Sequence, residues 1–167
     1  ALQISGAVSN IQIRKTANSW QAKSLLDDLG WQATNGIPGI EHVSGQLLIE
    51  ADKLQLDINA VDSALDFADG FSRPIPFNQL SARTRLNWGD SGWKLAVSDI
   101  QLHSDELSAS ADVQFLQENQ QSGVLSLFAY VRDGDASNVQ YYLPLPVMSE
   151  SLVDYLTGAI FHGDITQ

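Results

Sequence analysis

The stretch QLLIEADKLQLDINA, residues 46–60, decides the fold class. Apolar side chains alternate with polar ones in two runs: Leu47 and Ile49, then Leu54, Leu56 and Ile58. Strict alternation is the pattern of a β-strand with one buried face. The Ala-Asp-Lys segment between the runs predicts a tight reversal, so we expect a β-hairpin with one apolar face.

A second hairpin is expected in RLNWGDSGWKL, residues 85–95. With residues 89–92 as the loop, residues of the apolar side face each other in three pairs: Trp88 and Trp93, Leu86 and Leu95, Thr84 and Val97. Gly-Asp-Ser-Gly also surrounds the nucleophile of chymotrypsin-like proteases. In those proteases the motif continues with Gly-Pro, whereas here Trp93 follows Gly92. None of the three histidines has a recognisable triad setting. Ser91 is therefore interpreted as a turn residue.

Further alternating runs recur about every ten residues, separated by Gly, Asp, Asn or Pro, which is typical of an antiparallel meander. A slip of phase between Val8 and Ile11 predicts a β-bulge. Residues 18–31 fit either a helical turn or a strand, and the extended pattern that continues through Trp31 favours the strand. Residues 123–131 are apolar on both faces, which suggests a strand covered on both sides.

One helix is expected over residues 149–163, with Ser149 as its N-cap and Gly163 as its stop. The apolar residues of this segment recur at spacings of three and four, on one side of the helix. The expected fold is thus mainly β: a twisted, curved antiparallel sheet with a C-terminal α-helix. Residues 1–167 should form a single domain, cut from a longer protein.

Composition excludes several classes of function. The 167 residues carry a net charge of −11, which repels nucleic acid and anionic membrane surfaces, so we expect no nucleic-acid partner. The absence of cysteine removes thiolate catalysis and Cys-ligated zinc. Asp133 and Asp135 lack the other ligands of a calcium loop, and acidic pairs such as Asp27 and Asp28 suit solvated turns. We therefore expect no enzyme activity, no metal and no cofactor.

Three segments together resemble a known family. Residues 35–58 resemble an element with a Pro-Gly-Ile turn followed by two hairpin strands, and residues 71–95 resemble one with a proline-containing turn and a Trp-to-Trp hairpin. Residues 141–165 resemble a Tyr-Leu-Pro segment followed by a helix and a new strand. In this order and spacing they resemble the AsmA-like superfamily of Gram-negative bacteria, specifically its long YhdP-type members.

This resemblance implies a bridge-like lipid carrier, anchored in the inner membrane by an N-terminal helix outside this chain and spanning the periplasm. The implied fold is a long β-groove, or taco-like sheet, whose apolar face shields the acyl chains of phospholipids while the head groups project into water. Phospholipid would slide along it between the inner and outer membranes, supporting outer-membrane lipid homeostasis and barrier function. Membrane proteins at the two ends of the bridge would be its partners.

The apolar faces of the strands supply the candidate lipid-facing residues. They are Leu47, Ile49, Leu54, Leu56, Ile58, Leu86, Leu95, Val97, Val113, Leu125 and Leu127. The alternative for any of them is packing inside a closed core, against the expected helix. Alternative functions are a non-catalytic β-sandwich module that binds glycan or a structural partner, and a hydrolase. Exposed sheet edges also predict pairing between chains as a dimer.

Overall fold

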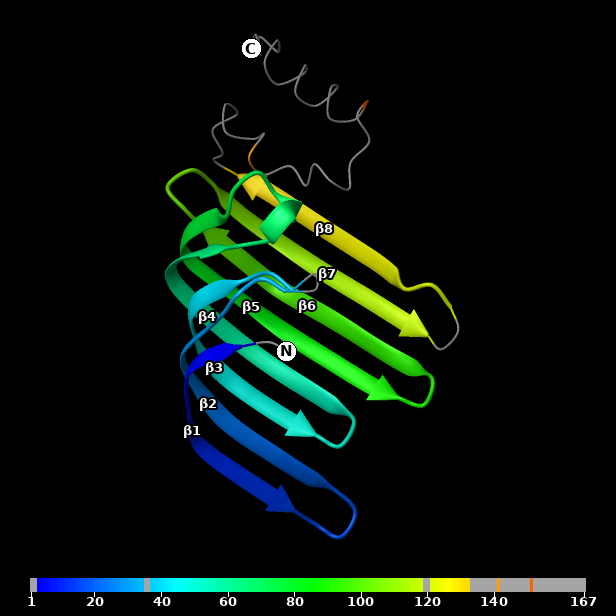
Figure 1. Ribbon diagram of the computed structural model, residues 1–167. Coiled ribbons are helices and arrows are strands. Elements are labelled where there is room, and N and C mark those ends of the chain that lie inside the picture. The colour runs from blue at the N-terminus through cyan, green and yellow to red at the C-terminus, as the bar shows by residue number, and fades with distance from the viewer. Residues whose placement is uncertain (1–2, 35–36, 119–120, 133–140, 142–150, 152–167) are drawn as a thin grey trace.

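The computed structural model describes residues 3–34, 37–118, 121–132, Tyr141 and Ser151. The strands form one eight-stranded antiparallel sheet in which every strand pairs with its neighbours in sequence, as Figure 1 shows. Their bounds are β1 Ile4–Lys15, β2 Trp20–Trp31, β3 Ile40–Glu50, β4 Lys53–Leu65, β5 Ile75–Gly89, β6 Gly92–His103, β7 Ser108–Glu118 and β8 Val124–Arg132. A short 3-10 helix, η1 Ala68–Gly70, lies between β4 and β5. The mainly β, antiparallel meander is confirmed.

Both predicted hairpins are confirmed. Strands β3 and β4 are joined by Ala51 and Asp52, and Leu47 pairs with Leu56. Strands β5 and β6 pair Trp88 with Trp93. Gly89 and Gly92 also pair, which shortens the turn to two residues and places Ser91 in it. The ambiguous segment before Trp31 is a strand, β2.

The two ends of the strands differ in regularity. One end of the sheet carries the short turns of the hairpins. We call this end, with its turns, the hairpin half; it comprises residues 11–24, 47–56, 84–97, 113–118 and 121–127. The other described residues form the loop half. Strand residues other than glycine with positive φ all lie in the loop half: Asn10, Asp28, His42, Asp62 and Asp99. In the hairpin half, Gly92 has a φ of 134° at the start of β6, next to its turn. The predicted bulge after Val8 is confirmed as a register shift at Asn10. Bulges increase strand twist and bend a sheet, so the loop half is the part that curls.

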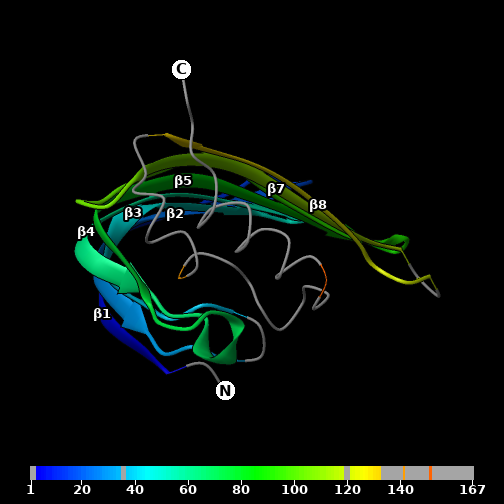
Figure 2. The same cartoon turned by 90° about the horizontal axis from the view of Figure 1, so that it is seen from above.

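Seen from above, the sheet is curved and η1 lies on its concave side (Figure 2). The buried core lies on the same side, within the loop half: Leu26, Leu29, Ile40, Val43, Ala60, Phe77, Leu80, Leu102 and Leu107. Leu65 and Ile75, which flank the β4–β5 connection, pack against this cluster. The core is thus formed between the curled sheet and the long connections that fold over it.

Two sequence-based expectations have a different outcome. The helix expected over residues 149–163 lies outside the described residues, apart from Ser151. The strand expected to be covered on both sides is β8, and every residue of it is exposed. That prediction was wrong because β8 has one strand neighbour in the described sheet, β7, and its apolar residues remain open on both faces.

Candidate functional site: the apolar concave face

Cross-strand pairing arranges the residues of the apolar face in three rows, of which one crosses all eight strands and two run from β2 to β8. The hairpin row has one apolar residue from every strand: Ile13, Ala22, Ile49, Leu54, Leu86, Leu95, Phe115 and Leu125. The middle row is Ser24, Leu47, Leu56, Thr84, Val97, Val113 and Leu127. The loop row is Leu29, Val43, Ala60, Leu80, Leu102, Ala109 and Val131. Directly paired residues share a face, so the rows form one apolar surface about 34 Å long, at about 4.8 Å per strand.

From β2 to β6 the loop row is covered by the chain itself, whereas Val131 on β8 is exposed. Val43, Ala60 and Leu80 retain only 1%, 0% and 3% of their accessible surface. The connections above them are tied together, because Gly39 and Asp66 exchange two backbone hydrogen bonds of 2.7 and 2.9 Å. An ion pair of 2.6 Å between Arg73 Nη2 and Glu106 Oε2 joins the β4–β5 connection to the β6–β7 connection. From β2 to β6, this end of the concave face is therefore a closed core.

The hairpin and middle rows are open. Leu54, Leu86 and Leu95 are half-buried. Trp88 and Trp93, which face each other at the hairpin end, are 38% and 39% exposed. A monomeric soluble protein rarely leaves a large continuous apolar patch open, and such a patch marks an interaction surface. The open rows are therefore the candidate functional site.

All eleven predicted lipid-facing residues lie on this face. Five belong to the hairpin row, Ile49, Leu54, Leu86, Leu95 and Leu125, and five belong to the middle row, Leu47, Leu56, Val97, Val113 and Leu127. Ile58 follows Leu56 on the same face and pairs with Gly45. Leu47, Leu56 and Ile58 also pack against the buried core. Their contact with lipid stays a prediction.

The same rows contain residues that the sequence-based list omitted. Ile13 and Ala22 continue the hairpin row onto β1 and β2, and Phe115 continues it onto β7. Phe115 belongs to the alternating run of β7 and was recognisable from that pattern. Ile13 was harder to place, because the bulge at Asn10 reverses the phase of β1.

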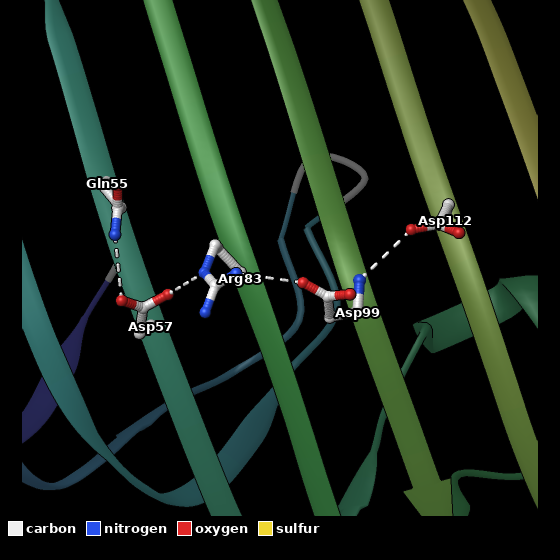
Figure 3. Close-up of polar contacts among 5 residues, drawn as sticks. All are labelled: Gln55, Asp57, Arg83, Asp99 and Asp112. Atoms are coloured by element: carbon white, nitrogen blue, oxygen red, sulfur yellow. Dashed lines mark hydrogen bonds and ion pairs between the residues drawn. The ribbon is translucent and has the colours of Figure 1, made fainter.

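The opposite, convex face is mainly polar on β2 to β7, while β8 adds exposed apolar residues to it. A line of side chains crosses four strands there, as Figure 3 shows: Gln55, Asp57, Arg83, Asp99 and Asp112. Arg83 bridges two strands, with Nε 2.8 Å from Asp57 Oδ1 and Nη1 3.2 Å from Asp99 Oδ2. Asp112 Oδ1 accepts a 3.2 Å hydrogen bond from the backbone N–H of Asp99, which gives this N–H a partner at the bulge on β6.

On this face, neighbouring side chains shift the pKa values of two titratable groups, Asp57 and His42. Partial burial raises the pKa of Asp57, but hydrogen bonds from Gln55 and Arg83 and the charges of Arg83 and Arg85 outweigh it, so the net pKa is lowered. A hydrogen bond to Asp28, and then the charge of Asp28, raise the pKa of His42. His42 Nδ1 lies 2.8 Å from Asp28 Oδ1, and both residues occupy bulges with positive φ. These contacts join neighbouring strands.

Other kinds of site find little support among the described residues. They contain no cluster of three or more His, Asp or Glu side chains able to hold a metal ion. Within the same residues, no helix has both the length and the apolar character to cross a membrane. Trp93 stacks on Phe115 at 4.9 Å between ring centroids, and the indole N–H of Trp31 donates to the Pro38 carbonyl at 2.8 Å. These rings are engaged with the protein, which does not favour the flat aromatic platform of a glycan-binding module.

Comparison with known proteins agrees with this architecture. The sequence model of the family described as YhdP protein matches residues 1–167. The chain belongs to the YhdP family. The chain is also similar to the intermembrane phospholipid transporter YhdP of Escherichia coli (strain K12), with 24% identity over 167 residues. The match covers 97% of this chain and 13% of that YhdP protein, so the chain spans a small part of its relative's length. No solved structure matches the chain.

Proposed function

We propose that this chain is a segment of a phospholipid carrier, in which the open apolar rows hold acyl chains as lipid passes along the sheet. The observation that carries the proposal is the hairpin row, in which all eight strands contribute an apolar residue. Burial of a methylene group stabilises by about 0.8 kcal/mol. The hairpin row has no polar side chain, so an acyl chain that lies along it can slide without losing this stabilisation at any step; the middle row contains the hydroxyl groups of Ser24 and Thr84.

The geometry also suits extension in both directions along the sheet. Ile11 and Ile13 on β1 and Leu125 and Leu127 on β8 are among the most exposed apolar residues. The hairpin row thus reaches both outer strands of the described sheet with an apolar residue at each end, whereas the middle row ends at Ser24 on β2. Pairing of β1 or β8 with a further strand would lengthen the apolar surface, and the same edges would support pairing between two copies of the chain.

The relative's name as an intermembrane phospholipid transporter supports phospholipid as the cargo and the periplasm as the location. We propose an inner-membrane anchor and partner proteins at both membranes for the full-length protein. The proposed action requires no covalent chemistry, and Ser91 has a structural role in its two-residue turn. The polar convex face would keep the span soluble.

A charge placed in the hairpin row tests the proposal. In the full-length protein, Leu86→Glu introduces a carboxylate on the acyl path, and Asn87→Glu makes the same change of charge at the next, exposed position, on the convex face. Movement of isotope-labelled phospholipid between the two membranes should fall strongly for Leu86→Glu and stay near normal for Asn87→Glu. Normal lipid movement with a normal amount of the Leu86→Glu protein would contradict the proposal.

A further inference from the structure

The chain beyond β8 returns to the concave side of the sheet. Strand β8 ends at Arg132, and Tyr141 lies nine residues beyond it in the sequence. The ring centroid of Tyr141 lies 4.4 Å from the guanidinium carbon of Arg73. Arg73 follows η1 in the β4–β5 connection, and η1 lies on the concave side (Figure 2). Tyr141 therefore marks a point at which the chain reaches the side of the sheet that carries the apolar rows.

Arg73 joins three parts of the chain at this point. Its Nη2 lies 2.6 Å from Glu106 Oε2, which ties the β4–β5 connection to the β6–β7 connection. A guanidinium that pairs with a carboxylate through its edge can still stack its flat face on an aromatic ring. The ring of Tyr141, which is half-buried, makes such a contact. The contact anchors the chain beyond β8 to the connections that cover the loop end.

The hairpin and middle rows present apolar side chains that water can reach. Ile13 is 74% exposed at one end of the hairpin row, Leu125 is 64% exposed at the other, and Leu127 ends the middle row at 66%. Neither row contains a charged side chain. Contact between apolar surface and water is unfavourable. When no acyl chain lies on the rows, occupation by another apolar group is therefore favoured.

The sequence beyond Tyr141 supplies a group of this kind. The helix expected over residues 149–163 lies outside the described residues, apart from Ser151, which is helical and exposed. The spacing of the apolar residues in this segment predicts that they share one side of the helix. They are Leu152, Tyr155, Leu156, Ala159 and Ile160, and the two acidic residues of the segment, Glu150 and Asp154, are not among them.

The lengths of the segment and of the rows are compatible. A helix of fifteen residues is about 22 Å long, and the apolar surface is about 34 Å long at about 4.8 Å per strand. The eleven residues from Tyr141 to Leu152 can span up to about 36 Å. The segment can therefore reach the open rows and, when it lies across the strands, cover about two-thirds of their length.

We propose that residues 149–163, named here the cover segment, occupy the open rows of the lipid-free protein through their apolar side, and that acyl chains displace them. This inference rests on the proposed function. The contact between Tyr141 and Arg73 keeps the displaced cover segment near the sheet, so that it returns when lipid leaves. Because the cover segment is shorter than the rows, an exposed outer strand remains on which an arriving acyl chain can begin the displacement.

A photoreactive amino acid at Leu86 tests this inference in the purified full-length protein. Leu86 lies in the hairpin row, and Asn87, on the convex face, is the control position. The protein is irradiated after removal of lipid and after loading from phospholipid vesicles, and mass spectrometry identifies the products. We expect cross-links from position 86 to the cover segment in the lipid-free protein, phospholipid adducts in their place in the loaded protein, and neither product at position 87.

The two outcomes that would contradict the account are distinguishable. Lipid adducts at position 86 in the loaded protein, with no cross-link to the cover segment in the lipid-free protein, would overturn this inference alone. Absence of lipid adducts at position 86 in the loaded protein would overturn the proposed function itself.

Matched variants of the cover segment make the test specific. Leu156→Glu should lower the cross-link in the lipid-free protein by about tenfold or more, because burial of a carboxylate against an apolar surface is unfavourable. Thr157→Glu adds the same charge outside the apolar side and should leave the cross-link unchanged. Tyr141→Leu removes the contact with Arg73 and should lower the cross-link less. Similar urea midpoints verify that the sheet is folded in all three variants, and equal cross-linking in Leu156→Glu and Thr157→Glu would overturn the inference.

Discussion

The hairpin half and the loop half of the sheet are built from the same strands and behave differently. In the loop half, strand residues with positive φ curl the sheet, and long connections bury its apolar face. In the hairpin half, pairing is regular from β3 to β8, and the apolar face stays open. Closing one end of each strand supplies stability. That stability lets the other end expose an apolar surface, which a fully open sheet of this size would not sustain.

Truncation of matched leucines should separate the two halves most clearly. Leu80→Ala, in the buried loop row, should lower the free energy of unfolding by about 2–5 kcal/mol, because it leaves a cavity in a closed core. Leu86→Ala, in the open hairpin row, should cost less than about 1.5 kcal/mol, since the site is already half-exposed. Urea unfolding of the chain measures both values. Equal losses would mean that the hairpin row is also part of a closed core.

Backbone strain offers a second contrast. Gly6 has a φ of 101°, and a Cβ there would lie 2.4 Å from the carbonyl oxygen of Asp28. Gly6→Ala should therefore cost about 1–3 kcal/mol. A Cβ at Gly89, in the hairpin half, has no neighbour within 4 Å, so Gly89→Ala should be close to neutral. Thermal unfolding of both variants tests this contrast, and similar midpoints would contradict the special role of the bulges.

The polar line on the convex face should contribute less. Arg83 is exposed and forms two ion pairs, so Arg83→Met should cost at most about 1 kcal/mol. Because salt screens exposed charges, the difference from the native chain should shrink at 1 M salt. Urea unfolding at low and high salt measures the effect. A larger cost that is independent of salt would indicate that Arg83 acts through packing.

The pair of His42 and Asp28 should produce the smallest effect, visible as a dependence on pH. Asp28 raises the pKa of His42 in the folded chain. The extra stability is therefore fully present below the unfolded value of about 6.5 and is lost as the pH rises through the higher folded value. His42→Asn preserves a residue that tolerates positive φ. Unfolding midpoints should differ more between the native chain and this variant at pH 5.5 than at pH 8.5, and an equal difference at both would contradict the coupling.

Local alternation was sufficient to predict much of the sheet. The spacing of Leu54, Leu56 and Ile58 gave the face of β4, and the two tryptophans at positions 88 and 93 gave the register of a hairpin. These predictions depended on neighbouring strands with short turns, where pairing follows from adjacent sequence. The position of the open apolar rows follows from the same pattern.

Long-range features were not predictable in the same way. Nothing in the local pattern shows that Ile40 and Leu107, near the long connections, are buried while Leu125 and Leu127 are exposed. Burial there depends on how the β4–β5 connection folds over the sheet, which involves residues distant in sequence. The bulges at Asp28 and Asp99 were also missed, since Asp suits both a turn and a strand with positive φ. The division of the concave face into a closed and an open half therefore required the structure.

The most direct test of the central claim is photocrosslinking in cells with the full-length protein. A photoreactive amino acid replaces Leu56 or Leu86 on the open rows, and Arg85, which points to the convex face, is the control. We predict phospholipid adducts at Leu56 and Leu86 and none at Arg85. Absence of adducts at all three positions, with folded protein present at normal amounts, would mean that these rows are an ordinary core and would contradict the lipid-carrying account.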